Sequence, residues 1–349
     1  MQPIETRLKL LFSANEADVT EDIMPDLLSF EYTDNETDEA DEISISLKDD
    51  TGKWASSWQP EGGEIVKASI TEGTVDTKGR TLNCGTFFVD TLGVSGAPQV
   101  VTIKAVSTPL NKPIRRKQVT RAWEGVTLAE ILSEIAGKAG MSGMYIADGI
   151  SYDRIDQSKE SDLSFLARLS KENGLSMKVT HEKIVIFDQQ QFESKSPIAT
   201  FERGSDSILS WSFEQQAAET YKSVKVTYKD PKQNGFDKGL NKNKDAVKEY
   251  TYTNPDADES GQEFELKKRA KSLEEAERMA KAKMRELNLK SVTGSMTVIG
   301  NVGLCSGSVI EIVGFGSFDG NFAITKAGHS YGTGGYTTSL DLRRTNANY

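Results

Sequence analysis

The chain has 349 residues, with 42 basic and 52 acidic side chains and a formal net charge of −10 at pH 7. This length exceeds what one hydrophobic core usually holds, so we expect two or three domains. A molecule this acidic is a poor partner for nucleic acid or anionic lipid, so we expect neither sequence-specific nucleic-acid binding nor a membrane partner. Its longest apolar runs have four or five residues, far fewer than the ~20 of a membrane-spanning helix.

Cysteine and histidine are too few and too scattered to suggest a metal site. Cys84 and Cys305 are 221 residues apart, and His181 and His329 are also isolated. Because no CxxC or similar spacing is present, we interpret the cysteines as reduced thiols of a cytosolic protein. No nucleophile motif lies near His329, which is interpreted as structural. These counts argue against a zinc site and leave little material for nucleophilic catalysis, so we expect no metal, no cofactor and no catalytic residue of this kind.

Residues 1–110 have the pattern of a small β-domain. Between 43 and 48 apolar and polar residues alternate, which is the period of a half-buried strand. Further strands are predicted at 7–12, 67–71, 87–91 and 100–106, with turn signals between them. Short strands spaced in this way favour a small barrel or sandwich.

Residues 111–196 are predicted to form a small α/β domain. Thr127 precedes an apolar stripe with helical spacing, and Thr127 and Glu130 have the spacing of a capping box. Ser161 is placed to cap a second helix. Residues 175–187 are predicted to form a hairpin.

Residues 197–349 are predicted to form a second β-domain with one long helix. The helix is expected over 262–288, where a narrow apolar stripe would pack on the outside of this domain. Residues 229–248 are rich in Lys, Asn and Gly and are interpreted as an exposed loop, with an ordered protein contact as the alternative. Asp319-Gly320 lies between two apolar alternations, which predicts a hairpin whose glycine needs positive φ.

An acidic run partly matches the spacing of a calcium-binding loop. Its members are Asp34, Glu36, Asp38, Glu39, Asp41 and Glu42. Glu39 stands where an EF-hand loop needs glycine, and Ile45 stands where it needs a bidentate glutamate. We therefore predict a solvated acidic turn rather than a calcium site.

Two other groups could bind partners. The basic group comprises Lys112, Arg115, Arg116, Lys117 and Arg121. It lacks interleaved aromatic residues, so we interpret it as an interdomain linker or a docking surface for an acidic partner rather than a phosphate site. Trp54 and Trp58 could form an exposed recognition patch, although packing onto the first β-domain is the commoner outcome for such aromatics.

Three segments, in this order, resemble the phage late control D family. The first is ISISLKDDTGKW, followed by Trp58-x-Pro60-Glu61-x-Gly63, and the second is SDLSFLARLSKENGLSMKVTHEKIVIFD. The third combines Gly314-Phe315-Gly316, Phe318-Asp319-Gly320, Ile324, His329, Gly335-Tyr336-Thr337-Thr338, Leu340, Leu342 and Arg343. The family comprises baseplate hub proteins of contractile phages and related injection systems.

The resemblance implies structural work rather than catalysis. Family hubs are homotrimers in which each chain carries two tube-type β-barrels, so that three chains present six. The implied fold is mainly β, with tube-type barrel domains at 1–110 and 197–349 flanking the α/β domain at 111–196. The implied function is a trimeric adaptor that joins the hexameric tail tube to a trimeric spike, in a contractile phage tail or a tailocin-like injection system.

The resemblance also implies partners and a location. The partners are two further copies of the chain, a tail tube protein or tube-initiating baseplate protein, a separate spike protein and other baseplate proteins. The location is the baseplate of a virion or phage-tail-like particle, assembled in the bacterial cytoplasm. Two alternatives stay open from the residues alone: a tail-associated cell-wall hydrolase, and a carbohydrate-binding tail-tip adhesin that would use Trp54 and Trp58.

Overall fold

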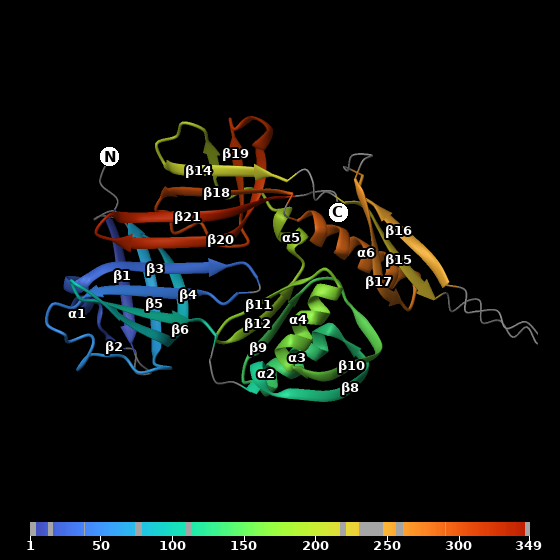
Figure 1. The fold of residues 1–349 in the computed structure, drawn as a ribbon, viewed down its shortest axis with the longest axis horizontal. Coiled ribbons are helices and arrows are strands. Elements are labelled where there is room, and N and C mark those ends of the chain that lie inside the picture. Colours follow the sequence, from blue (N-terminus) through green and yellow to red (C-terminus); the bar gives the residue numbers. More distant parts are fainter. Residues whose placement is uncertain are drawn as a thin grey trace, which may run out of the picture.

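The architecture is mostly β, with an α/β part inserted between two β-parts (Figure 1). The computed structural model describes residues 5–12, 17–37, 39–73, 79–108, 113–216, 221–229, 247–255, 261–289 and 291–345. The predicted mainly β fold with an α/β insertion is thus confirmed. Within these residues, none of the helices has the length and apolar character needed to cross a membrane.

The first β-part, unit 1, wraps one hydrophobic core. Its six main strands are β1 (Glu5–Phe12), β3 (Leu27–Asn35), β4 (Glu42–Lys48), β5 (Ile65–Gly73), β6 (Arg80–Ser95) and β7 (Val100–Val106), accompanied by β2 (Ala17–Asp18), α1 (Thr20–Ile23) and the short helix η1 (Met24–Asp26). The alternation predicted for β4 buries Ile43, Ile45 and Leu47 completely. The sheet curls, so β1 and β5 run across β3 and β4 in Figure 1.

The second β-part, unit 2, has a separate core. Its strands are β13 (Thr200–Glu202), β14 (Ile208–Gln215), β18 (Val292–Ile299), β19 (Val309–Val313), β20 (Gly320–Gly332) and β21 (Gly335–Arg344), with the short helix η3 (Gly316–Phe318) before β20. Phe322, Ile324 and Leu340 lie at the centre of this core and are almost fully buried.

The α/β part follows unit 1 in the chain. It comprises α2 (Pro113–Arg116), β8 (Gln118–Thr127), α3 (Leu128–Lys138), β9 (Ser142–Ile146), β10 (Ser151–Ser161), α4 (Asp162–Glu172), β11 (Ser176–Val179), β12 (Lys183–Phe187) and α5 (Gln189–Glu193). Both predicted caps are confirmed: Thr127 and Glu130 form a capping box on α3, and Ser161 accepts from the Ser164 N–H on α4. The predicted hairpin is β11 paired with β12.

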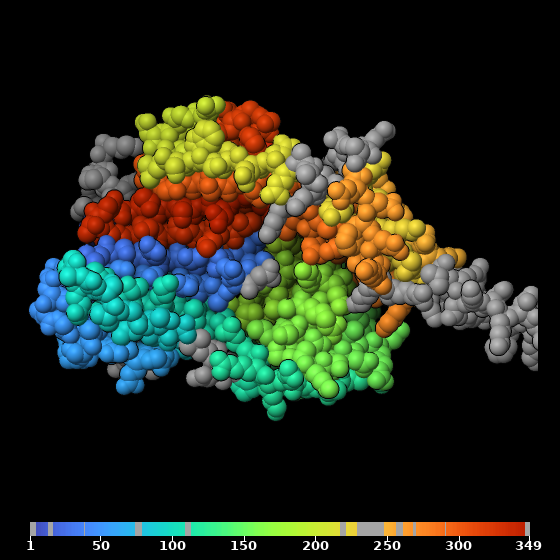
Figure 2. Space-filling view, viewed as in Figure 1, coloured from blue at the N-terminus to red at the C-terminus, as the bar shows by residue number. Residues whose placement is uncertain are grey.

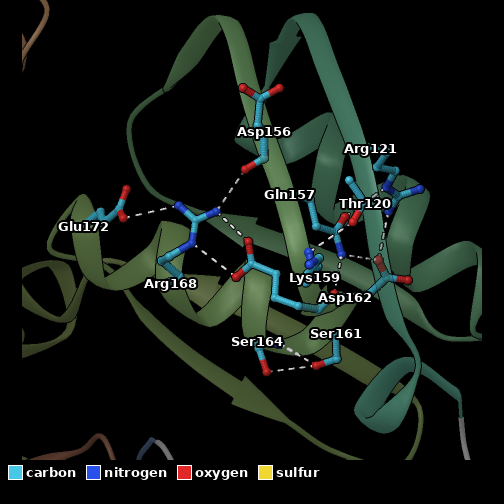
Figure 3. Close-up of polar contacts among 11 residues, drawn as sticks. Thr120, Arg121, Asp156, Gln157, Lys159, Ser161, Asp162, Ser164, Arg168 and Glu172 are labelled. Carbon is cyan, nitrogen blue, oxygen red and sulfur yellow. Dashed lines mark hydrogen bonds and ion pairs between the residues drawn. The ribbon is translucent and has the colours of Figure 1, made fainter.

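A polar network holds α4 against β8 and β10 (Figure 3). Arg168 makes two hydrogen bonds to Glu160, at 2.7 and 3.2 Å. Arg121, from the predicted basic group, donates to Asp162 at 3.0 Å and stacks on the Trp123 ring, with 4.1 Å from its guanidinium carbon to the ring centroid. At least this member of the basic group therefore stabilises its own domain.

The helix predicted over 262–288 is wrong in its first third. Gln262–Ala270 forms strand β17, and α6 spans Leu273–Asn288 after Ser272, whose hydroxyl caps it. Phe264 and Leu266 alternate with charged residues, and this period of two, rather than a helical period, decides the local structure.

Helix α6 also packs elsewhere than predicted. Instead of covering unit 2, it covers a three-stranded sheet of β15 (Tyr221–Lys229), β16 (Val247–Thr253) and β17, where Val224, Ala276 and Ala280 are fully buried. The reason is that its small alanines fit closely against this sheet, while its charged face stays in water. Most of the predicted loop at 229–248 lies outside the described residues.

The hairpin glycine before β20 supports a prediction. Gly320 has φ +129°, which L-residues rarely adopt, and a Cβ there would meet no atom within 4 Å. Gly320→Val should therefore destabilise the chain through backbone strain alone, by about 1–3 kcal/mol. The melting temperature should fall, whereas the control Gly334→Val, where φ is not positive and space is also open, should melt close to the wild type.

Candidate assembly interface

Units 1 and 2 have the same strand order. When the six strands of each unit are labelled a to f in chain order, both sheets run b-c-f-e-d-a. In unit 1 this order is β3-β4-β7-β6-β5-β1, and in unit 2 it is β14-β18-β21-β20-β19-β13. The copies differ in strand a, because β1 is antiparallel to β5 whereas the short β13 is parallel to β19. They also differ between strands b and c, where unit 2 carries the sheet with α6.

The irregularities of the two sheets match as well. Strand b has one extra residue between Leu27 and Ser29 in unit 1, and between Ile208 and Ser210 in unit 2. Strand e has one extra residue at Asp90 in β6 and at Thr325 in β20. Because a bulge fixes local register, these shared positions align the copies residue by residue.

The residues that precede strand d make the same hydrogen bond to strand e in both units. The Gly63 N–H donates to the Val89 carbonyl at 2.7 Å, and the Gly307 N–H donates to the Ile324 carbonyl at 2.8 Å. Both glycines have positive φ. The two units are therefore copies of one structural element.

The two copies join edge to edge. Strand b of unit 1, β3, pairs antiparallel with strand e of unit 2, β20, from Ser29–Gly332 to Asn35–Lys326. This junction merges both units into one 13-stranded sheet. Figure 2 shows a red band of unit 2 atoms packed directly against a blue band of unit 1 atoms.

A buried histidine lies at the centre of this junction. His329 is 1% exposed, and its ring stacks on that of Tyr32 with centroids 5.9 Å apart. Its Nε2 lies 3.0 Å from the Leu304 carbonyl oxygen, and its Nδ1 lies 2.7 Å from the Tyr336 hydroxyl. In the neutral ring, Nε2–H donates to the carbonyl and Nδ1 accepts from the tyrosine. His329 is thus structural, as predicted.

The burial of His329 predicts a pH effect. Burial lowers the pKa of His329 below its ordinary value of about 6.5. When the pH falls below about 6.5, His329 takes up a proton in the unfolded chain but not in the folded chain. The contribution of His329 to the free energy of unfolding is therefore fully present above this pH and decreases below it. Between pH 7.5 and 5.5, the melting temperature of the wild type should fall more steeply than that of His329→Gln. Equal slopes for the two proteins would contradict this.

The predicted solvated acidic turn is wrong for three of its six residues, while Glu39 is exposed and Asp38 lies outside the described residues. Asp34, Glu36 and Asp41 are 5–6% exposed. Lys178 of β11 lies 2.6 Å from Asp34 and 3.2 Å from Asp41. The prediction failed because the cation that allows this burial comes from a distant segment of the chain.

This cluster connects three parts of the chain. Asp34 belongs to β3, Lys178 to the α/β part, and Ser306, whose N–H and hydroxyl both donate to Asp34 at 2.8 and 2.7 Å, to unit 2. Burial raises the pKa of Asp41, while the two carboxylates raise the pKa of Lys178 against the effect of its own burial. The arrangement is a structural clamp at the junction.

A second buried cluster lies beside the first. Arg343 of β21 is 4% exposed and pairs with Glu36 at 3.2 Å and with Glu193 of α5. Arg285 of α6 also pairs with Glu193, at 2.6 Å. Burial raises the pKa of Glu36. Four parts of the chain thus meet in this ionic network.

The tryptophans do not form a paired exposed surface. Trp54 is 4% exposed, packs in the core of unit 1, and donates from Nε1 to Asp26 at 2.9 Å. Trp58 packs edge-on against Trp54, yet 47% of it is exposed. The commoner outcome, packing onto the first β-domain, therefore holds for Trp54.

In the 13-stranded sheet, the two edges that are equivalent to the halves of the internal junction have no strand partner among the described residues. One is the free side of β14, and the other is the side of β6 from Thr91 to Ser95, beyond the end of its pairing with β5. Both expose large apolar side chains: Leu209 is 55%, Trp211 46% and Val94 54% exposed. Their equivalents in the internal junction, Leu28, Phe30 and His329, are half-buried or buried.

The family resemblance implied two β-domains of one type, but the residue patterns by themselves were not recognised as a repeat, although a signal was present. Strand b reads LLSFEY at 27–32 and ILSWSF at 208–213. These are two identical residues and three apolar or aromatic matches in six positions. So short a likeness becomes meaningful only when the strands occupy equivalent places in two sheets.

Known proteins share both sequence and fold with this chain. The model of the phage tail baseplate hub (GPD) family matches residues 108–335. A probable baseplate hub protein of Escherichia phage P2 is 31% identical over 223 residues, which are 62% of this chain and 55% of that protein. The chain thus spans about half the length of this curated relative.

Two solved structures share the fold over nearly their whole length. The 43 kDa tail protein of prophage MuSo2 from Shewanella oneidensis has a TM-score of 0.73 at 14% identity, covering 99% of this chain and 100% of that one. A tail protein from Neisseria meningitidis MC58 has a TM-score of 0.70 at 12% identity, covering 97% and 96%. The family match covers more than half of the chain, and the chain therefore belongs to the phage tail baseplate hub (GPD) family.

Proposed function

We propose that this chain is the trimeric hub of a phage-tail or tailocin-like baseplate, where it joins a hexameric tail tube to a trimeric spike. One observation carries the proposal: each chain contains the same β-element twice, joined edge to edge. Three chains then supply six copies of that element toward a sixfold tube, while the α/β part and the sheet with α6 occur three times, which suits a threefold spike.

The proposed role, together with the family resemblance, implies a set of partners. They are two further copies of the chain, a tail tube or tube-initiating protein on the sixfold side, a separate spike protein on the threefold side, and neighbouring baseplate proteins. The particle would be assembled in the bacterial cytoplasm. The role is structural, which agrees with the name of the phage P2 relative. The net charge of −10 suits a ring through which DNA passes without adhering.

Mass measurement in solution and imaging of the particle test this function. Native mass spectrometry of the concentrated chain should show trimers, and electron microscopy of the tail should show three chains at the tube–spike boundary. A chain that stays monomeric at high concentration and occupies another position in the particle would refute the proposal.

A further inference from the structure

We infer that β14 of one copy pairs with the outer half of β6 of a second copy, repeating between chains the β3–β20 junction found within one chain. This inference rests on the proposed function, because it names the surface through which the hub chains meet. The occupant of both free edges is thus another copy of this chain. The argument follows from the equivalence of the two units, strand by strand.

The strands involved are equivalent in type. The internal junction joins strand b to strand e, which are β3 and β20. Among the strands equivalent to these two, strand b of unit 2, β14, and the outer half of strand e of unit 1, β6, have no strand partner in the described residues. Each chain therefore carries one complete b–e junction and the two halves of another.

Shared bulges fix the register of the second junction. The β3–β20 register pairs Tyr32 with His329 and Glu31 with Ser330. Transferred through the equivalent positions, it pairs Phe213 with Val94 and Ser212 with Ser95 across the two chains. In the inferred junction, the pair of Val94 and Phe213 therefore takes the place that the stacked rings of His329 and Tyr32 have in the internal junction.

The backbone groups of β14 have the orientation that this pairing needs. The Gln216 N–H donates to the Ser291 carbonyl at 2.9 Å, on the β18 side of the strand. Because N–H groups alternate sides along a strand, those of Gln215 and Phe213 point away from β18, toward the free edge. Unit 1 shows the same alternation. Gln216 is equivalent to Asn35, and the N–H of the next residue, Glu36, points to the other side of the strand, where it donates across the internal junction to the Thr325 carbonyl at 2.9 Å.

Side chains also favour the contact. Pairing would cover the exposed apolar groups on both edges, including Val94 and Trp211, and apolar edges of this kind promote strand pairing. In the inferred register, Gly93 lies opposite Glu214 and Leu92 opposite Gln215, so no two like charges face each other. Cross-strand repulsion is therefore absent from these pairs.

The contact is heterologous, because two different edges of the chain meet in it. Successive copies can therefore add in the same way until a ring closes. A copy that offers β14 to one neighbour still offers β6 to the next. Because the junctions within and between chains are equivalent, each unit meets its neighbours in the same way. Three chains closed in this manner form a continuous wall of six units.

Engineered cysteines test the pairing in the full-length chain. Ser95 and Ser212 are exposed, and the register makes them a non-hydrogen-bonded pair with Cα atoms about 4.5 Å apart, within disulfide range. The Ser95→Cys/Ser212→Cys variant should form intermolecular disulfides under mild oxidation, visible as bands of two and three chains on a non-reducing gel. The native thiols should not contribute, because burial raises the pKa of Cys84 and raises that of Cys305 to about 11.

Control variants and the possible outcomes distinguish a failure of the inferred strand pairing from a failure of the proposed trimeric hub. Each single cysteine variant, and Ser95→Cys combined with Ser210→Cys two positions out of register, should cross-link at least tenfold less. Trimers by native mass without disulfides in the double variant would overturn the inferred pairing and leave the hub proposal standing. Disulfide-linked rings of another copy number would support the pairing and refute the trimer. Monomers without cross-links at any concentration would refute both.

Discussion

A Val94→Asp chain will fold normally and fail to assemble with other copies. In the monomer Val94 is 54% exposed, so a carboxylate there stays in water. Across the inferred junction it would lie against Phe213 without a cation, at a cost of about 3 kcal/mol or more, or about a hundredfold in affinity. Sedimentation or native mass spectrometry should detect the loss of trimers, while the melting temperature of the monomer should barely change.

Ile299→Asp is the matched control for this variant. Ile299 has the same exposure of 54% but lies on β18, which is not an edge strand. Its replacement should leave assembly within about twofold of the wild type. If both variants assemble as the wild type does, the β6 edge is not where copies meet.

Replacing Lys178 with methionine will destabilise the folded chain by about 3–5 kcal/mol. The change leaves Asp34 and Asp41 buried without their cation, and unpaired buried charge is among the most damaging consequences of a single substitution. Urea unfolding followed by circular dichroism should show the loss as a lower midpoint.

Two further variants check the cause of that effect. Lys171→Met removes a lysine whose side chain is 72% exposed and which pairs with Glu286, so its cost should be below about 1 kcal/mol. Adding Asp41→Asn to Lys178→Met removes one of the unpaired charges and should recover part of the stability. A full loss in Lys171→Met, or no recovery in the double variant, would contradict a charge-based clamp.

Local patterns predicted local structure well. The alternation at 43–48 became β4, the strand predicted at 100–106 matches β7, and both helix caps of the α/β part form as expected. The reason is that these signals depend on neighbours within a few residues, and their periodicity agrees with the final burial. Where the apolar stripe was narrow, as at 262–288, periodicity alone misassigned a strand.

The sequence by itself determined the mostly β class, the inserted α/β part and, through its ordered motifs, the family. Tertiary structure alone decided three things: that Asp34, Glu36 and Asp41 are buried, that α6 packs on a sheet of its own, and which strand edges of the two β-units join and which stay free. The first and the third of these depend on residues more than 100 positions apart, such as Asp34 with Lys178 or β3 with β20, and the second joins segments within 221–288. Sequence patterns report on neighbouring residues, whereas burial and pairing depend on what the fold brings into contact.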